Sequence, residues 1–348
     1  MSSGRRTSPS GLAACLAFAV AVNASAQNLP PTDAGRVGSL PRSEDIYQPV
    51  TPETLERIQE MWASRDLGAR SVEVVYAESQ AESRILLVRH EVSGKAHYGA
   101  ILLPDSDDLS GTPVMLIADG LNQEYPAIDI EKIIAGWQGN GPTPDFIRVV
   151  PGFRGRTLKY AGMEYLSEGD FCDAFDGAAD DAIAMLNVAQ TLLPAANFDD
   201  VLAWGASRGG NVALLMGIRD ERVNTVMASA APVDFYWPPL REELRDQFAC
   251  QFLEGKSAVQ ARERMVASSP LYFDMQDNVE DVFLYHGTRD DVVPMWNSYE
   301  MARQLEASGV SVTSFFYRFA NHGNFIYAPA YSADYETGIE AFRDNLAN

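Results

Sequence analysis

Short apolar segments that alternate with helical patterns constrain the fold of this chain more than any other feature. The segments 113–119 (PVMLIAD) and 145–151 (DFIRVVP) are short and mostly apolar. Strands that are apolar on both faces are typical of a parallel sheet that helices cover on each side. A helical pattern follows, with apolar residues spaced by four and three positions: Ala179, Ile183, Leu186, Ala189 and Leu193. We therefore predict an α/β fold with a mostly parallel central sheet and helices on both faces.

The flanking segments extend this organisation in both directions. Thr51–Arg65 is predicted as a helix with Pro52 near its first turn, and a final helix begins near Ala333. Together they predict a leader and helix at 27–68 and one domain at 69–348. The predicted strands are 71–77, 83–92 and 96–104, which open the sheet in an antiparallel manner, and 199–205, 224–232, 281–288 and 311–319; a further helix is predicted at 295–308.

One longer interruption, at 237–270, separates two of the later strands and has a helical pattern. It forms either a small cap over the strand ends or a longer crossover, and we favour the cap. In open parallel sheets, ligands bind outside the carboxyl ends of the strands. Functional residues are therefore expected in the turns that follow strands.

The first 26 residues have the pattern of a signal peptide. Arg5 and Arg6 precede an apolar run, Leu12–Val22, and the small residues Ala24–Ala26 form a cleavage site before Gln27. The run is shorter than the roughly 20 residues that span a bilayer. A lipoprotein cleavage box and a twin-arginine signal fit the residues less well. We expect an exported protein, periplasmic or extracellular, without stable membrane insertion after cleavage.

The strongly acidic composition bears on the partners of the protein. The formal net charge is −21, and the sequence has neither a low-complexity tract nor an internal repeat. An acidic surface repels phosphate backbones, so we expect no nucleic-acid partner. The sequence carries no signal for an oligomeric state.

Export places the mature chain in an oxidising compartment, where disulfides persist. Two cysteines remain after signal cleavage, Cys172 and Cys250. They form either one intramolecular disulfide or two buried free thiols, and the sequence leaves both readings open.

The segment 205–210 (GASRGG) follows an apolar strand and precedes a helical pattern. A G-x-S-x-G sequence in this place is typical of a nucleophile elbow, a tight turn that exposes a serine. Gly205 and Gly209 leave room for the turn around Ser207, and the N–H of Arg208 is the first expected oxyanion donor. The alternative, a glycine-rich turn with an incidental serine, does not explain the strand and helix on either side.

A serine nucleophile needs a base and an acid from later in the chain. Of four histidines, His322 alone follows the last predicted strand, so we expect it to be the base. The acid should follow the preceding strand, where Asp290 and Asp291 are both present. A buried carboxylate there would hold the histidine in the required tautomer.

Several motifs together resemble the catalytic domain of the prolyl oligopeptidase family. HGTRDDVVP is similar to the family's H-G-x-x-D-x-x-V-P, and this resemblance selects Asp290 as the acid. The further matches are GASRGG, FRG (Phe153–Gly155), SSPLYF and NHGNF, and the resemblance covers roughly 96–347. It implies an α/β-hydrolase fold with a small helical insertion before the acid strand. Relatives that resemble dienelactone hydrolases and acetyl esterases share much of this pattern.

Two departures from the family concern access and the oxyanion loop. Roughly a hundred residues precede the matching region, which is too short for the β-propeller that usually gates peptide substrates in the family. The loop ADGLNQEY (118–125) replaces the His-Gly-Gly of some relatives, so the N–H of Leu121 is the second expected donor. Tyr125, Phe153 and Arg154 are the expected substrate-binding residues.

These residues predict a serine hydrolase that acts through an acyl-enzyme on a short peptide or another small molecule. The resemblance favours a peptidase, and an open site favours a carboxylesterase or acetylesterase. An inactive hydrolase fold used for binding would not need a positioned base. No metal-ligand spacing and no phosphate-binding loop is present, so we expect no metal and no cofactor.

Overall fold

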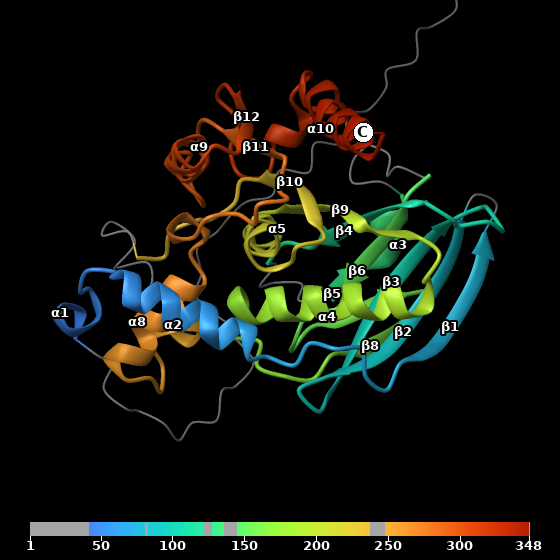
Figure 1. The fold of residues 1–348 in the computed structure, drawn as a ribbon, viewed down its shortest axis with the longest axis horizontal. Coiled ribbons are helices and arrows are strands. Elements are labelled where there is room, and N and C mark those ends of the chain that lie inside the picture. The colour runs from blue at the N-terminus through green and yellow to red at the C-terminus, as the bar shows by residue number, and fades with distance from the viewer. Residues whose placement is uncertain (1–41, 81–82, 122–126, 136–144, 237–247, 348) are drawn as a thin grey trace, which may run out of the picture. The chain divides into compact units, whose positions relative to one another are not determined.

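The computed structural model describes residues 42–80, 83–121, 127–135, 145–236 and 248–347. Within them, one large sheet has the strand order β1-β2-β3-β6-β4-β9-β10-β11-β12 (Figure 1). The first three strands, β1 (Glu73–Gln80), β2 (Ser83–Val92) and β3 (Lys95–Pro104), are antiparallel, as predicted. The other six are mutually parallel: β6 (Ile147–Pro151), β4 (Pro113–Ala118), β9 (Asn197–Ala206), β10 (Val223–Ser229), β11 (Asp281–Gly287) and β12 (Ser311–Tyr317).

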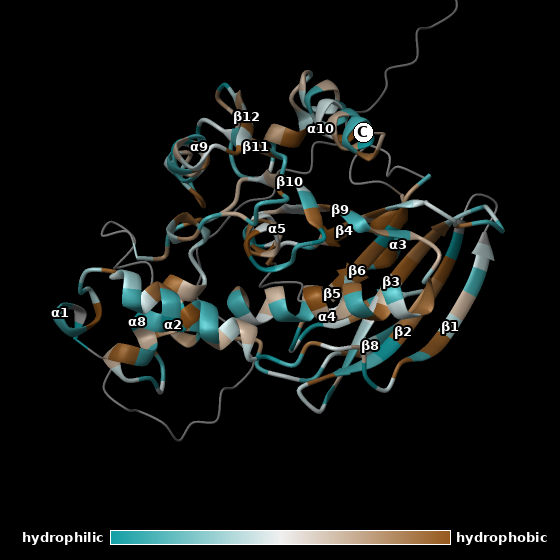
Figure 2. Ribbon diagram, in the orientation of Figure 1, coloured by the Kyte–Doolittle hydropathy of each residue, from teal (hydrophilic) through white to brown (hydrophobic). Residues whose placement is uncertain are grey.

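Helices cover both faces of this sheet, which Figure 2 shows as mostly apolar strands between helices of mixed polarity. On β10, Val226 faces Gly217 of α5 (Arg208–Arg219), whereas Met227 faces Gly338 of α10 (Tyr331–Leu346). Successive strand residues point to opposite faces, so α5 and α10 lie on opposite sides. The helix α4 (Asp176–Leu192) packs beside α5, and α9 (Trp296–Ser308) packs on β11 and β12. The predicted α/β fold is therefore confirmed.

An N-terminal helix, α2 (Pro52–Ala63), is anchored to the start of α4 by polar contacts. Thr51 caps the helix, as its side-chain oxygen accepts from the N–H of Thr54. At the other end, the Trp62 indole donates to Asp176 at 2.7 Å, and Arg65 contacts the same carboxylate at 2.8 Å. The short helix α1 (Ser43–Ile46) precedes α2. These contacts connect the region before residue 69 to the main sheet.

A second, three-stranded sheet was not expected from the sequence. It consists of β5 (Ala127–Asp129), β7 (Thr157–Tyr160) and β8 (Met163–Leu166), and the short helix α3 (Ile130–Ile134) follows its first strand. Strands of three or four residues are too short to produce a recognisable periodicity. Their pairing depends on chain segments brought together by the larger sheet.

The insertion expected at 237–270 is described from residue 248 onward. It contains α7 (Ala249–Phe252), α8 (Ala258–Ala267) and the 3₁₀ turn η3 (Pro270–Tyr272), while a second turn, η4 (Phe325–Tyr327), precedes α10. The helix α8 packs against α1 and α2. A disulfide joins Cys250 of α7 to Cys172 before α4, with 5.4 Å between the Cα atoms. The proposed covering of the strand ends stays a prediction, because residues 237–247 lie outside the described part.

The predicted signal peptide also lies outside the described residues. Among the residues that are described, none of the helices combines the length and the apolarity needed to cross a membrane.

Candidate active site

Ser207 occupies a sharp turn between β9 and α5, at the carboxyl end of the sheet. Its backbone has φ 55° and ψ −122°, a positive-φ conformation that a non-glycine residue adopts at a cost of about 1–3 kcal/mol. Its N–H donates to the Ser229 carbonyl of β10 at 2.7 Å. A Cβ atom at Gly209 would overlap with the Ala118 carbonyl oxygen of β4, so the turn packs directly on the neighbouring strand end.

The imidazole of His322 connects Ser207 to Asp290. His322 Nδ1 lies 2.7 Å from Asp290 Oδ2, and His322 Nε2 lies 3.0 Å from Ser207 Oγ. A carboxylate only accepts, so Nδ1–H is the donor and Nε2 is left to accept the serine hydroxyl. The structure thus brings the three predicted side chains together, although Asp290 is 32 residues and Ser207 is 115 residues from His322 in the chain.

Backbone N–H groups of the loop after β11 fix the position of the Asp290 carboxylate. Oδ1 accepts the N–H groups of Val292 and Val293 at 3.0 and 2.8 Å, which leaves Oδ2 for His322. Burial alone would raise the pKa of Asp290, but hydrogen bonds from His286, His322 and the Val293 N–H lower it below its usual value. The carboxylate is therefore ionised at neutral pH.

His286, which the sequence analysis left without a role, supports this loop. Its Nε2–H donates to the Val293 carbonyl at 2.8 Å and lies 3.3 Å from Asp290 Oδ2. Nδ1 is then left to accept the Ser298 hydroxyl at 2.7 Å. The spacing of the H-G-x-x-D-x-x-V-P motif is the signal that identifies this residue, because the motif places His286, Asp290 and the Val293 carbonyl in one closed turn.

The loop that carries His322 is shaped by two asparagines. The side-chain oxygen of Asn321 accepts the N–H groups of Gly323 and Asn324 at 3.1 and 3.0 Å, and that of Asn324 accepts the Asn321 N–H at 2.7 Å. Side chains of this kind satisfy a tight turn by mimicking backbone hydrogen bonds. The imidazole is 21% exposed, whereas the Asp290 side chain is fully buried.

The two expected oxyanion donors belong to segments that meet at the elbow. Arg208 begins α5, and the first N–H groups of a helix have no intrahelical acceptor. Leu121 follows Gly120, at which a Cβ would lie 3.9 Å from the Ser207 Cβ. The third residue proposed near this loop, Tyr125, lies outside the described residues.

Phe153 does not reach the surface as the substrate-binding assignment requires, whereas the Arg154 side chain is 17% exposed. Phe153 is fully buried, and its ring lies 3.9 Å beneath the Arg208 guanidinium. Arg154 is held by the Asp181 and Asp173 carboxylates at 2.7 and 2.5 Å. Burial excludes contact between the Phe153 ring and a substrate, and the expected substrate-binding role of Arg154 stays a prediction.

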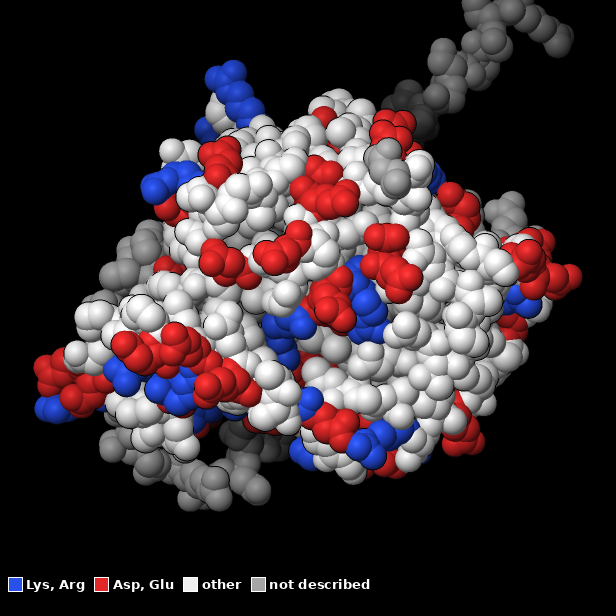
Figure 3. Space-filling view, in the orientation of Figure 1, with Lys and Arg blue, Asp and Glu red and all other residues white. Residues whose placement is uncertain are grey.

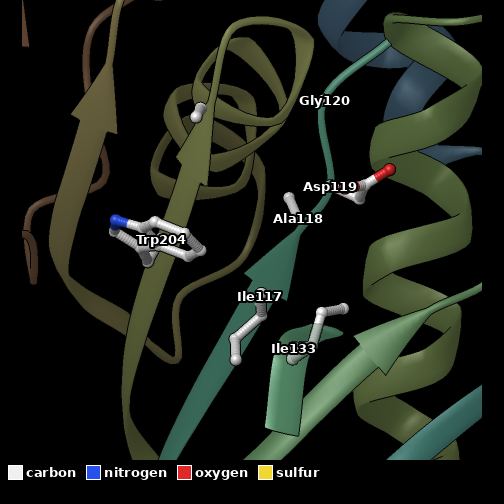
Figure 4. Close-up of a pocket in the computed structure, with 7 residues that line it drawn as sticks. Ile117, Ala118, Asp119, Gly120, Ile133 and Trp204 are labelled. Atoms are coloured by element: carbon white, nitrogen blue, oxygen red, sulfur yellow. The ribbon is translucent and has the colours of Figure 1, made fainter. Parts of the chain in front are cut away.

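A narrow, mostly apolar pocket lies beside the oxyanion loop (Figure 4). Its walls come from the ends of β4 and β9 and from α3, and the Asp119 carboxylate points away from Trp204. The lining residues are Ile117, Ala118, Asp119, Gly120, Ile133, Trp204 and Ala206. In the part of the chain that is described, no group of three or more His, Cys, Asp and Glu side chains is arranged to bind a metal ion.

Acidic side chains are spread over the described surface in the view of Figure 3, where Lys and Arg form no continuous band. On this face the acidic side chains do not gather at one site.

Solved structures with a similar fold include both esterases and peptidases. Acetyl xylan esterase 1 from Thermoanaerobacterium sp. JW/SL YS485 is 13% identical over 83% of this chain and 92% of its own, with a TM-score of 0.55. An acetyl xylan esterase from Paenibacillus sp. R4 is 15% identical over 85% of this chain and 98% of its own, with a TM-score of 0.54. Acylaminoacyl peptidase from Pyrococcus horikoshii is 13% identical over 78% of this chain, with a TM-score of 0.54, and this chain spans about half of it (49%).

The solved structures share the fold of this chain, and together with a matching family model they define the protein as an α/β-hydrolase of the serine hydrolase type. No curated protein matches the chain. A family model matches residues 145–348, more than half of the sequence, and the chain belongs to the prolyl oligopeptidase family.

Proposed function

We propose that this protein hydrolyses acyl bonds through a covalent intermediate on Ser207. The observation that carries the proposal is the continuous hydrogen-bonded series from Ser207 Oγ to His322 at 3.0 Å and from His322 to Asp290 at 2.7 Å. In this arrangement His322 Nε2 takes the hydroxyl proton as Ser207 attacks the carbonyl carbon. Asp290 keeps the tautomer and stabilises the resulting imidazolium.

The tetrahedral intermediate places a negative oxygen near the start of α5. The N–H groups of Arg208 and Leu121 stabilise it, and the imidazolium then donates its proton to the leaving group. Water enters, His322 removes one of its protons, and the hydroxide oxygen attacks the acyl carbon. The bond from that carbon to Ser207 Oγ then breaks, and His322 returns the proton to Oγ as the acid leaves. The same residues therefore act in both halves of the reaction.

Short peptides are the first candidate substrates, because the chain belongs to the prolyl oligopeptidase family. An amide leaves as an amine only when it is protonated, and His322 is placed to supply that proton. Small esters are the second candidate. The two acetyl xylan esterases support this candidate, because they match this chain over nearly their full length.

A fluorophosphonate probe tests the nucleophile directly, because it labels activated serines. The wild-type protein should be labelled and Ser207→Ala should not. The turnover of Ser207→Ala should fall by about 10⁴- to 10⁶-fold while the circular dichroism spectrum is kept. A wild-type protein that resists labelling, or a variant that retains activity, would refute the proposal.

Two chromogenic substrates separate the candidate activities. The wild-type protein is assayed with p-nitrophenyl acetate and with prolyl and aminoacyl p-nitroanilides. Measurable nitroanilide turnover that Ser207→Ala abolishes supports a peptidase. Turnover confined to the ester supports the second candidate and rejects the first.

We further propose that the protein works after export and removal of residues 1–26. The disulfide between Cys172 and Cys250 supports this, because such bonds persist in oxidising compartments. N-terminal sequencing of the protein recovered from its native compartment should begin at Gln27, and recovery of an intact Met1 would contradict export.

A further inference from the structure

Two buried arginines donate hydrogen bonds to backbone carbonyls of the loop that follows β4. Arg208 donates from Nη2 to the Asp119 carbonyl at 2.6 Å and to the Gly120 carbonyl at 3.3 Å, and its Nε adds a bond to Asp119 at 3.1 Å. Arg156 donates from Nη1 to the Gly120 carbonyl at 2.6 Å. Both side chains are 1% exposed, so these bonds form away from water.

The surroundings keep the two guanidinium groups in place. The Arg208 group lies over the Phe153 ring at 3.9 Å, and the Arg156 group lies 3.3 Å from the Asp119 carboxylate. Burying a guanidinium is unfavourable unless it is paired, and here backbone carbonyls accept from both groups while the Asp119 carboxylate pairs with Arg156. Three segments that follow different strand ends are thereby tied together.

The geometry of the peptide unit connects these bonds to the reaction. The Gly120 carbonyl and the Leu121 N–H belong to one trans peptide, so they point in opposite directions. The arginines hold the carbonyl on the interior side, so the N–H of the same peptide points away from them. Among the described residues, the Leu121 N–H has no hydrogen-bond acceptor. A cation on the carbonyl also polarises the peptide and strengthens its N–H as a donor.

We propose that the side chains of Arg208 and Arg156 are positioning residues that orient the Leu121 N–H toward the oxyanion of the acyl-transfer reaction. The inference rests on the proposed function and goes beyond it. Arg208 then contributes twice: its own N–H is one donor, and its side chain fixes the other. A substitution of the side chain leaves the first donor intact and isolates the second role.

The test uses two variants of Arg208. Arg208→Met keeps the apolar stem but removes every side-chain donor, and Arg208→Lys can reach only one carbonyl. Arg156→Lys examines the second arginine in the same way. Arg219→Met is the matched control. Arg219 is a buried arginine at the other end of the same helix, where it pairs with Asp176 and Asp180 far along α5 from the elbow.

Three readouts distinguish positioning from a merely structural role. The first is the split between kcat and KM for p-nitrophenyl acetate. The second is the inhibition constant of an aryl trifluoromethyl ketone. Ser207 Oγ adds to its carbonyl carbon, the hydroxyl proton passes to His322, and the former carbonyl oxygen occupies the oxyanion position. The third is the melting temperature.

Arg208→Met should lower kcat by about 10²-fold, the lower range for loss of one oxyanion donor, with KM nearly unchanged. The trifluoromethyl ketone should bind more weakly by a similar factor, and Arg208→Lys and Arg156→Lys should show smaller losses in the same direction. Arg219→Met should lower the melting temperature and leave kcat and ketone binding unchanged.

A folded Arg208→Met with wild-type kcat and wild-type ketone binding overturns the positioning role, as does an equal loss in Arg219→Met. If Arg208→Met does not fold, the two lysine variants decide: unchanged kcat in both overturns the proposal. The fluorophosphonate experiment distinguishes failure of the proposed function from failure of this inference. If the proposed function is wrong, the wild-type protein will not react with the probe at all.

Discussion

Replacing Asp290 by asparagine should inactivate the protein through the orientation that its amide is forced to adopt. The carboxylate uses Oδ1 to accept the N–H groups of Val292 and Val293, and Oδ2 to accept from His322. In asparagine, one oxygen and one NH₂ group replace the two carboxylate oxygens, so one of the two positions loses its acceptor. Turning the NH₂ group toward the backbone would leave two buried N–H groups without an acceptor, at about 1–3 kcal/mol each. The oxygen should therefore stay on the backbone side.

The NH₂ group then faces His322 Nδ1, which must accept. The proton of the neutral imidazole moves to Nε2, so the nitrogen next to Ser207 Oγ can no longer take the hydroxyl proton. Loss of the correct tautomer in a serine triad lowers kcat by about 10⁴-fold, or about 5 kcal/mol in the activation free energy.

Steady-state kinetics on whichever chromogenic substrate the wild-type protein turns over measure this loss. Asp291→Asn is the matched control, because Asp291 is the adjacent acid, is exposed, and lies in the same loop. The control should keep wild-type kcat. An Asp290→Asn protein with more than about a tenth of wild-type kcat, or an equal loss in Asp291→Asn, would refute the assignment of the acid.

Two further substitutions test the structure around the site. Gly209→Ala would place a Cβ on the Ala118 carbonyl oxygen, so the free energy of unfolding measured in urea should fall by more than the roughly 1–3 kcal/mol usual for overpacking. Gly323→Ala is the control and should be neutral, because a Cβ there meets open space. Equal stabilities of the two variants would contradict the tight elbow. Cys172→Ser combined with Cys250→Ser opens a loop spanning 78 residues, which in the chain-entropy model removes up to about 4.5 kcal/mol of unfolding free energy. The reduced wild-type protein should match the double variant in urea unfolding, and identical midpoints before and after reduction would contradict the bridge.

Local patterns in the sequence specified most of the large sheet. The predicted strands 113–119 and 281–288 correspond to β4 (Pro113–Ala118) and β11 (Asp281–Gly287), and the helix expected at 51–65 corresponds to α2 (Pro52–Ala63). Such elements are encoded by neighbouring residues, because strand burial and helix periodicity repeat within a few positions. The short strands β5, β7 and β8 carry no such repeat, and their small sheet was not predicted.

The supporting residues of the site could not be predicted in the same way. Arg156 and Phe153 both follow β6, and nothing in their local sequence indicates that one holds a backbone carbonyl while the other lies under a guanidinium. The substrate-binding assignment of Phe153 was wrong for this reason. Which face of a loop is buried depends on the segments packed against it.

By itself, the sequence determined the α/β fold, the glycines around Ser207 and the order in which serine, acid and histidine occur along the chain. Those features depend on turn geometry and on the alternation of strand and helix, which are local. The tertiary structure was needed to show that the carboxylate of Asp290 contacts two histidines, His286 and His322, and two backbone N–H groups. It alone also decided that two arginines turn the Gly120 carbonyl inward. Contacts between groups far apart in the chain form only when the parallel strands bring their carboxyl ends to one edge of the sheet.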